Sequence, residues 1–299
     1  MVTLEQQLHV AAQKGNSLEI QSLLSANISL QVDCRDREGT TPLIVAACNG
    51  HLDAARQLVL KGADVNAYRT TGTTALFFSA QSGHAEMVKL LLDYGADIES
   101  SSNDGGTPLL VASQCGHHQT VEELLVRGAN PNCELIDGAT PLFLAAQNGY
   151  LSIVKLLINF HADVNHRRKD NTTALWIAAQ MGQTEVVREL IRLKSDVDAT
   201  REDGATALFK ACHKGHLEVA VDLVNAGASL SLLPNGESAL HAAAMFGHVH
   251  VVKALITAGA TPTMRNTNRI TAIDLAKLEG REEVVKLLTS VKPRVTTVV

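Results

Sequence analysis

The stretch GTTPLIVAACNGHLDAARQLVLKGADVNA, from Gly39 to Ala67, decides the fold because the chain copies it. Its opening marker returns every 33 residues, and once after 32. The copies of this marker begin at Gly39, Gly72, Gly105, Gly138, Asn171, Gly204, Gly236 and Arg269. A second glycine marker keeps the same period from Gly50 to Gly280, with an earlier copy at Gly15. A fixed period of this length is typical of repeat architectures, so nine units are predicted instead of one large core.

Each unit predicts two short helices. In the copy from Gly138, Thr140 is suited to cap the first helix. The residues at i, i+3 and i+4 from Leu142 are apolar and therefore share one helix face. Gly149 ends this helix, and a second helix is expected over residues 151–158. Two such helices cannot bury their apolar faces alone, so neighbouring units must stack.

Two units depart from this pattern. Most copies carry a glycine just after the second helix, where a left-handed residue closes the helix. His161 and Lys194 replace that glycine. A residue with a side chain is strained in a left-handed conformation. We therefore expect the array to be looser between about residues 160 and 236.

The strings quoted from Gly39 to Ala67, and GATPLFLAAQNGYLSIVKLLINFHADVN from Gly138 to Asn165, resemble ankyrin repeats. The resemblance covers about Leu4 to Ser290. It implies an all-α ankyrin repeat solenoid of stacked helix–turn–helix units with β-hairpin fingers. We expect a single domain over 1–290 and a flexible tail over 291–299. The nine units are expected at 4–35 (N-terminal cap unit), 36–68, 69–101, 102–134, 135–167, 168–200, 201–232, 233–265 and 266–290 (C-terminal cap unit).

Composition narrows the function classes. Aromatic residues make up only 3% of the chain, so many thin aliphatic interfaces must supply the core. A net charge of −5 argues against nucleic acid as the main partner. No apolar run is long enough to insert into a membrane, and the N-terminus does not resemble a signal peptide. Five widely spaced cysteines predict free thiols in a reducing compartment, the cytoplasm or the nucleus. A monomer is expected.

No enzyme is predicted, because the repeat accounts for nearly every residue and no phosphate loop or zinc motif is present. Catalytic residues, metal ligands and cofactors are therefore expected to be absent. A histidine recurs after the second glycine marker. These residues are His51, His84, His117, His216 and His248. Stacked units lie about 10 Å apart, too far for their histidines to share a metal ion. The resemblance implies that these histidines form hydrogen bonds between repeats.

A second stripe on the first helices is the candidate partner site. Its members are spaced i, i+4 in pairs, which places them on one helix face. They are Phe77 with Gln81, Leu110 with Gln114, Phe143 with Gln147 and Trp176 with Gln180, and Phe209 continues the series. One interpretation is packing against the fingers. The other is a hydrophobic and glutamine-lined surface for an extended or helical ligand, which the resemblance would place in the concave groove of the solenoid.

Two further candidate binding sites each allow two interpretations. Arg167, Arg168 and Lys169 form a basic cluster at one finger, either a solvated turn or a seat for an acidic or phosphorylated partner. Thr297 with a terminal Val299 resembles a PDZ-domain ligand, and a frayed terminus is the alternative.

The function predicted is non-catalytic protein–protein recognition, as a scaffold that docks one or more unknown partner proteins through the groove and the finger tips. One alternative is a regulator or inhibitor that masks a single enzyme or transcription factor. A subunit of an enzyme is a further alternative.

Overall fold

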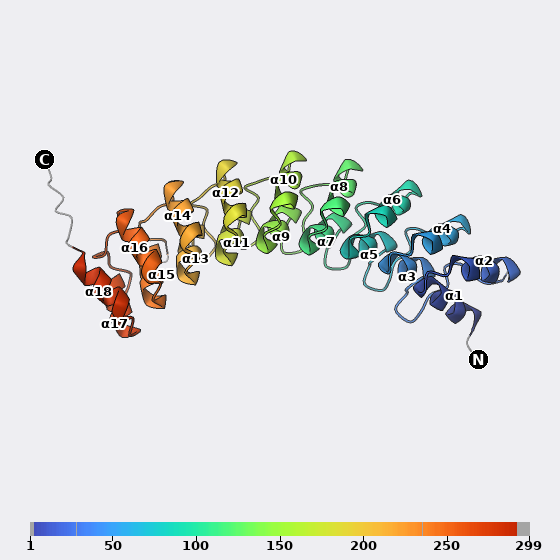
Figure 1. Cartoon of the computed structure of the whole chain (residues 1–299), viewed down its shortest axis with the longest axis horizontal. Helices are drawn as coiled ribbons and strands as arrows, with labels where there is room; N and C mark the ends of the chain where they lie inside the picture. Colours follow the sequence, from blue (N-terminus) through green and yellow to red (C-terminus); the bar gives the residue numbers. More distant parts are fainter. Residues whose placement is uncertain (1–2, 28, 235, 292–299) are drawn as a thin grey trace. The chain divides into compact units, whose positions relative to one another are not determined.

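The computed structural model describes residues 3–27, 29–234 and 236–291, and this part of the chain forms eighteen helices and no β-strand. The helices come in nine pairs that follow one another along the sequence (Figure 1). The first helices of the pairs are α1 (Leu4–Gln13), α3 (Pro42–Cys48), α5 (Ala75–Ser82), α7 (Pro108–Cys115), α9 (Pro141–Asn148), α11 (Ala174–Met181), α13 (Ala207–Lys214), α15 (Ala239–Phe246) and α17 (Ala272–Leu278). The second helices are α2 (Ser17–Ala26), α4 (Leu52–Leu60), α6 (Ala85–Asp93), α8 (His118–Val126), α10 (Leu151–Asn159), α12 (Thr184–Arg192), α14 (Leu217–Asn225), α16 (Val249–Thr257) and α18 (Glu282–Ser290).

The chain also divides into two compact units, each of which contains several of the repeats. The described residues of 1–145 and 152–163 form the N-terminal unit, and those of 146–151 and 164–299 form the C-terminal unit. The boundary falls within α9, at the start of α10 and again in the finger after α10.

The predicted caps begin the first helices. Thr74 Oγ1 accepts a hydrogen bond from the backbone N–H of Phe77 at 3.2 Å. Thr173 does the same for Trp176 at 3.2 Å, and Ser238 does so for His241 at 3.3 Å. Each bond satisfies one N–H that the first turn of a helix leaves open. The capping role predicted for this repeated position is therefore confirmed in both units.

Small side chains build the core of each pair. In the N-terminal unit Leu43, Ala46 and Ala47 are buried on one face of α3, which packs against α4 and α5. In the C-terminal unit α13 packs in the same way against α14 and α15. Because alanine lets helix backbones approach closely, many thin interfaces replace one thick aromatic core.

The fingers between repeats are turns, not two-stranded hairpins. Within the described residues only isolated bridges form, between Tyr68 and Thr74 and between Arg265 and Thr271. Side chains instead join one finger to the next. Asn66 Oδ1 accepts a hydrogen bond from the backbone N–H of Asp97 at 2.8 Å. The fingers are therefore positioned by side-chain bonds to the neighbouring repeat as well as by their own turns.

His161 and Lys194 adopt the left-handed backbone that their positions in the repeat predict. Their φ angles are 67° and 61°, in the region that favours glycine. Asn171 and Arg269 share this conformation, with φ angles of 65° and 61°. The predicted local strain at His161 and Lys194 is thus present. The looser packing expected around them stays a prediction.

Candidate functional site

The predicted aromatic column is packed. We define the third-position column as the third residue of each first helix from α3 to α15. They are Ile44, Phe77, Leu110 and Phe143 in the N-terminal unit, and Trp176, Phe209 and His241 in the C-terminal unit. Only 5% of Phe143 and 3% of Trp176 is exposed; Leu110 and Phe209 are also buried, and Phe77 is half-buried. Packing therefore accounts for these side chains, and partner contact through them stays a prediction.

Hydrogen bonds show what the column packs against. The indole Nε1–H of Trp176 donates to the backbone carbonyl of Ala205 at 2.8 Å. His241 Nε2 makes the equivalent bond to the carbonyl of Ile270 at 3.1 Å. Both carbonyls belong to the finger of the following repeat. Position three therefore faces the next finger, because the repeat step brings that finger over the start of the helix.

The glutamines of the stripe lie at the surface. Gln81 and Gln114 are exposed, and Gln147 and Gln180 are half-buried. An i, i+4 spacing put each glutamine on the same helix face as its column residue. The following finger covers only the start of the helix, so the two members of a pair differ in burial. The surface part of the predicted site therefore consists of amide side chains.

The residue after the second glycine marker binds the preceding repeat. His117 Nε2 donates to the backbone carbonyl of Gln81 at 2.9 Å, and His216 Nε2 donates to that of Gln180 at 3.0 Å. The remaining bonds of this kind come from His51, His84 and His248. The structure thus confirms the hydrogen bonds between repeats that the resemblance implied. Among the described residues no three His, Cys, Asp or Glu side chains are grouped to hold a metal ion.

Glutamine and arginine replace this histidine in two repeats of the C-terminal unit. The amide Nε2 of Gln183 donates to the carbonyl of Gln147 at 3.1 Å, and Arg281 Nε donates to that of Met245 at 3.0 Å. Different side chains therefore make the same contact. In these repeats a side-chain N–H makes the contact, whether it belongs to an imidazole, an amide or a guanidinium group.

The basic cluster at 167–169 is partly neutralised. Arg167 Nη2 lies 3.3 Å from Asp196 Oδ2, and Arg168 Nη1 lies 3.8 Å from Asp170 Oδ2. Asp170 also pairs with Arg201 Nε at 3.4 Å. Lys169 is exposed. The adjacent Asp170 and the distant Asp196 both lie beside the arginines, so the cluster is less basic than its three cationic side chains alone indicate.

The predicted PDZ ligand, Thr297 and Val299, lies outside the described residues. All five cysteines are free thiols, as predicted. Of the described helices, none combines the length and apolar character that crossing a membrane demands.

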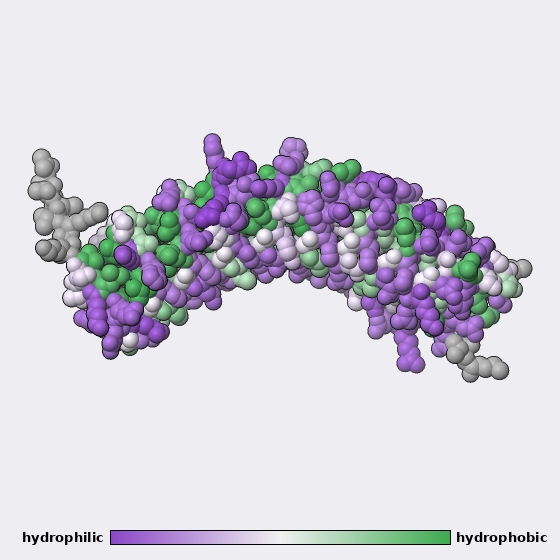
Figure 2. Space-filling view, viewed as in Figure 1, coloured by the Kyte–Doolittle hydropathy of each residue, from purple (hydrophilic) through white to green (hydrophobic). Residues whose placement is uncertain are grey.

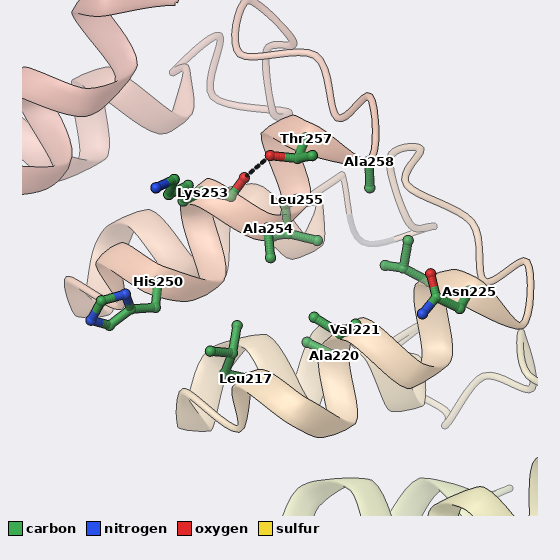
Figure 3. A pocket seen from close by; sticks show the side chains of 11 residues that line it. Leu217, Ala220, Val221, Asn225, His250, Lys253, Ala254, Leu255, Thr257 and Ala258 are labelled. Carbon is green, nitrogen blue, oxygen red and sulfur yellow. Dashed lines mark hydrogen bonds between the residues drawn. The ribbon is translucent and has the colours of Figure 1, made fainter.

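One groove was not predicted. It has a volume of about 590 Å³ and lies between α14 and α16 in the C-terminal unit (Figure 3). Leu217, Ala220 and Val221 line one side, and His250 and Ala254 line the other. Apolar residues also gather on the visible surface over these helices (Figure 2). The signal in the sequence was Ala254, since the equivalent positions of the two preceding repeats hold the longer Glu189 and Asp222.

A fold of paired short helices, joined by finger turns and linked through a recurring donor after a glycine, defines a helical repeat protein. The family description "ankyrin repeats (3 copies)" matches overlapping segments from residue 5 to residue 297. The matched segments are 5–69, 60–134, 109–203, 142–233, 189–266 and 223–297. The chain therefore belongs to the ankyrin repeat family. The all-α solenoid predicted from the repeats is confirmed.

Three relatives share local similarity. Ankyrin repeat domain-containing protein 29 is 51% identical in Homo sapiens and 48% in Danio rerio, each over 59 residues, which is 20% of this chain. The match spans 19% and 20% of those relatives. Ankyrin repeat domain-containing protein 49 of Bos taurus is 47% identical over 57 residues, which is 19% of this chain and 24% of the relative. The matches thus span about a fifth of the first two relatives. Ankyrin repeats are generally non-catalytic modules of protein–protein interaction.

Proposed function

We propose that this chain is a non-catalytic scaffold that binds partner proteins through the surface of its first helices and through its fingers. The observation that carries the proposal is the contrast within each pair of the stripe. Column residues such as Leu110 and Trp176 are buried in the stack, whereas Gln81 and Gln114 are exposed at a repeated position. The repeat thus presents a row of amide side chains that stacking does not bury.

Amide side chains suit such a surface. Glutamine offers both donors and an acceptor, so it can adapt to different polar groups on a partner. The backbone beneath it is held by bonds such as the one from His117 to the carbonyl of Gln81. A surface that is already ordered loses little conformational entropy when a partner docks. The five free thiols support a place inside the cell, where a reducing environment keeps cysteines unpaired.

The test is a quantitative capture of binding proteins with the full chain. One variant, Gln81→Ala/Gln114→Ala/Gln147→Ala/Gln180→Ala, removes the amides. The control, Glu86→Ala/Lys89→Ala/Glu122→Ala/Lys155→Ala, changes four exposed residues of second helices and leaves the net charge unchanged. Both must show wild-type helical content.

We expect the amide variant to lose its specific partners by about fivefold or more, because a few central contacts carry most interface energy. The control should retain them. Partners retained equally by both variants would show that the first-helix surface is not the binding site.

A further inference from the structure

Among the seven first helices from α3 to α15, one carries charged side chains. Helices α3, α5, α7, α9, α11 and α15 contain no Asp, Glu, Lys or Arg. Helix α13 reads ALFKACHK and carries Lys210 and Lys214 at i, i+4, so both ammonium groups project from one face. The whole chain has a net charge of −5, so the composition gives no hint of this local positive site.

Lys210 lies over aromatic rings. Its Nζ is 5.5 Å from the ring centroid of Trp176 and 5.9 Å from that of Phe209. These distances fall within the range in which a ring face attracts a cation. The two rings therefore hold the ammonium group in place at the surface of the stack.

The two lysines lack a carboxylate partner within the part of the chain that the structure describes. Neither Lys210 nor Lys214 forms an ion pair among the described residues. The nearby finger acids Asp170 and Asp203 pair with Arg201 instead, at 3.4 and 3.6 Å. Glu202 and Glu237 are the remaining acids of the two adjoining fingers.

The neighbouring His213 responds to this charge. Burial lowers its pKa, and the positive charges of Lys210 and Lys214 lower it further. The direction of this shift agrees with the lack of an ion-pair partner for either lysine among the described residues.

Apolar side chains flank the lysines. Met181 on α11 and Phe246 on α15 occupy the same position in the repeat as Lys214, and they are 47% and 40% exposed. The rings of His213 and Phe246 are 4.3 Å apart, so the α13 and α15 parts of this face adjoin. Methionine and phenylalanine are side chains that binding surfaces favour. The face thus presents a cation between two apolar groups.

We infer that this face of α11, α13 and α15 binds an acidic peptide segment of a partner protein. Carboxylates of the segment pair with Lys210 and Lys214, and apolar side chains on either side of them pack against Met181 and Phe246. This inference rests on the proposed function and specifies the partner chemistry of one part of the surface. The flanking apolar groups and the negative net charge favour a peptide over a nucleic acid, whose binding depends mainly on phosphate contacts with many basic residues.

The test selects peptides on the full chain from a phage library of random 12-residue peptides. The affinity of selected peptides is then measured for the wild type and for three variants. Lys210→Gln/Lys214→Gln removes the charge, and Lys210→Arg/Lys214→Arg keeps it. The third variant, Lys89→Gln/Lys155→Gln, removes two exposed lysines from second helices as a control for net charge.

We expect selected peptides to be rich in Asp and Glu beside Leu, Met or Phe. Their affinity should fall about tenfold in the Gln variant of α13, stay within about twofold in the Arg variant and in the control, and weaken with salt. A fluorescent 12-nucleotide oligo-dT should bind more weakly than the peptides. Equal binding of the oligonucleotide, or peptides without an acidic excess, would overturn the inference.

The outcomes also separate the inference from the proposed function. Peptides that depend on Gln81 and Gln114 but not on Lys210 and Lys214 would refute the inference and leave the proposed function standing. Peptides that depend on neither pair, or a failure to select any, would count against both.

Discussion

The first helices of the N-terminal unit and those of the C-terminal unit share their buried residues and differ at the surface. Helices α5 and α7 end on the exposed Ser82 and Cys115, which are small and neutral. At the same position α11, α13 and α15 expose Met181, Lys214 and Phe246. Stacking therefore constrains the buried positions of the first helices, and the two units differ at the positions that stacking leaves exposed.

The backbone differs between the units as well. Four of the described residues other than glycine adopt a left-handed conformation, and three of them, Asn171, Lys194 and Arg269, lie in the C-terminal unit. In the N-terminal unit the contact after the second glycine marker comes from histidine in three repeats, whereas in the C-terminal unit Gln183 and Arg281 also make it. The repeat is therefore more regular in the N-terminal unit.

The largest expected effect on stability comes from a comparison of two glycines, one packed against a rigid ring and the other against a flexible side chain. Gly83 and Gly247 have nearly the same φ, 76° and 77°. A Cβ at Gly83 would lie 2.5 Å from Nδ1 of the His117 ring, whereas at Gly247 it would meet Arg281 Cδ, part of a flexible side chain, at 2.9 Å. We expect Gly83→Ala to lower the free energy of unfolding by about 3 kcal/mol and Gly247→Ala by about 1.5 kcal/mol. Urea unfolding followed by circular dichroism measures both, and equal losses would contradict the comparison.

A smaller effect is expected in the third-position column. Ile44, Phe77 and Leu110 offer no side-chain donor, whereas Trp176 donates to the carbonyl of Ala205. Trp176→Phe keeps an aromatic ring but leaves that buried carbonyl without its indole partner. We expect a loss of about 1.5 kcal/mol in the free energy of unfolding. A loss below about 0.5 kcal/mol would show that packing alone holds this residue.

Relief of backbone strain should give a gain in stability. Lys194→Gly removes the left-handed penalty of a residue with φ 61°, and should raise the free energy of unfolding by about 0.5–1 kcal/mol after the entropy of glycine is counted. Gly227→Lys is the reverse change at the equivalent position of the next repeat, where an added Cβ meets nothing within 4 Å. It should cost a similar amount. If Lys194→Gly destabilises the chain as Gly227→Lys does, backbone strain at Lys194 does not lower the stability of the native chain.

Two histidines make stability depend on pH in opposite ranges. A hydrogen bond with Cys34 raises the pKa of His9 in the N-terminal unit from 6.5 to about 9. Its contribution to stability is complete below pH 6.5 and is lost as the pH rises through about 9. Burial, with Lys210, Lys214 and His248, lowers the pKa of His213 in the C-terminal unit. The stability linked to neutral His213 is therefore complete above pH 6.5 and is lost as the pH falls through the lowered pKa.

Titration of the two ring signals by nuclear magnetic resonance checks these signs. Cys34→Ala should return the pKa of His9 toward 6.5, and Lys210→Gln/Lys214→Gln should raise the pKa of His213. The matched control is Lys89→Gln/Lys155→Gln, which should move neither value. A His213 pKa that does not respond to the loss of the α13 lysines would remove one support for the positive site.

Much of the fold followed from the sequence alone. The period placed the helices, the threonines before them predicted the caps, and the resemblance implied the histidine bonds between repeats. These features are local or recur at a fixed distance along the chain, so the spacing of residues is enough to predict them.

The burial of the candidate site, its charge and the groove between α14 and α16 required the tertiary structure. The i, i+4 pairing of Trp176 with Gln180 was visible, but only stacking brings the carbonyl of Ala205 over the indole and leaves the glutamine nearer the surface. Similarly, Asp196 neutralises Arg167 from 29 positions away. A sequence pattern determines which residues share a helix face. The next repeat decides which of them it covers, because burial and ion pairing depend on distances between segments that the local sequence does not contain.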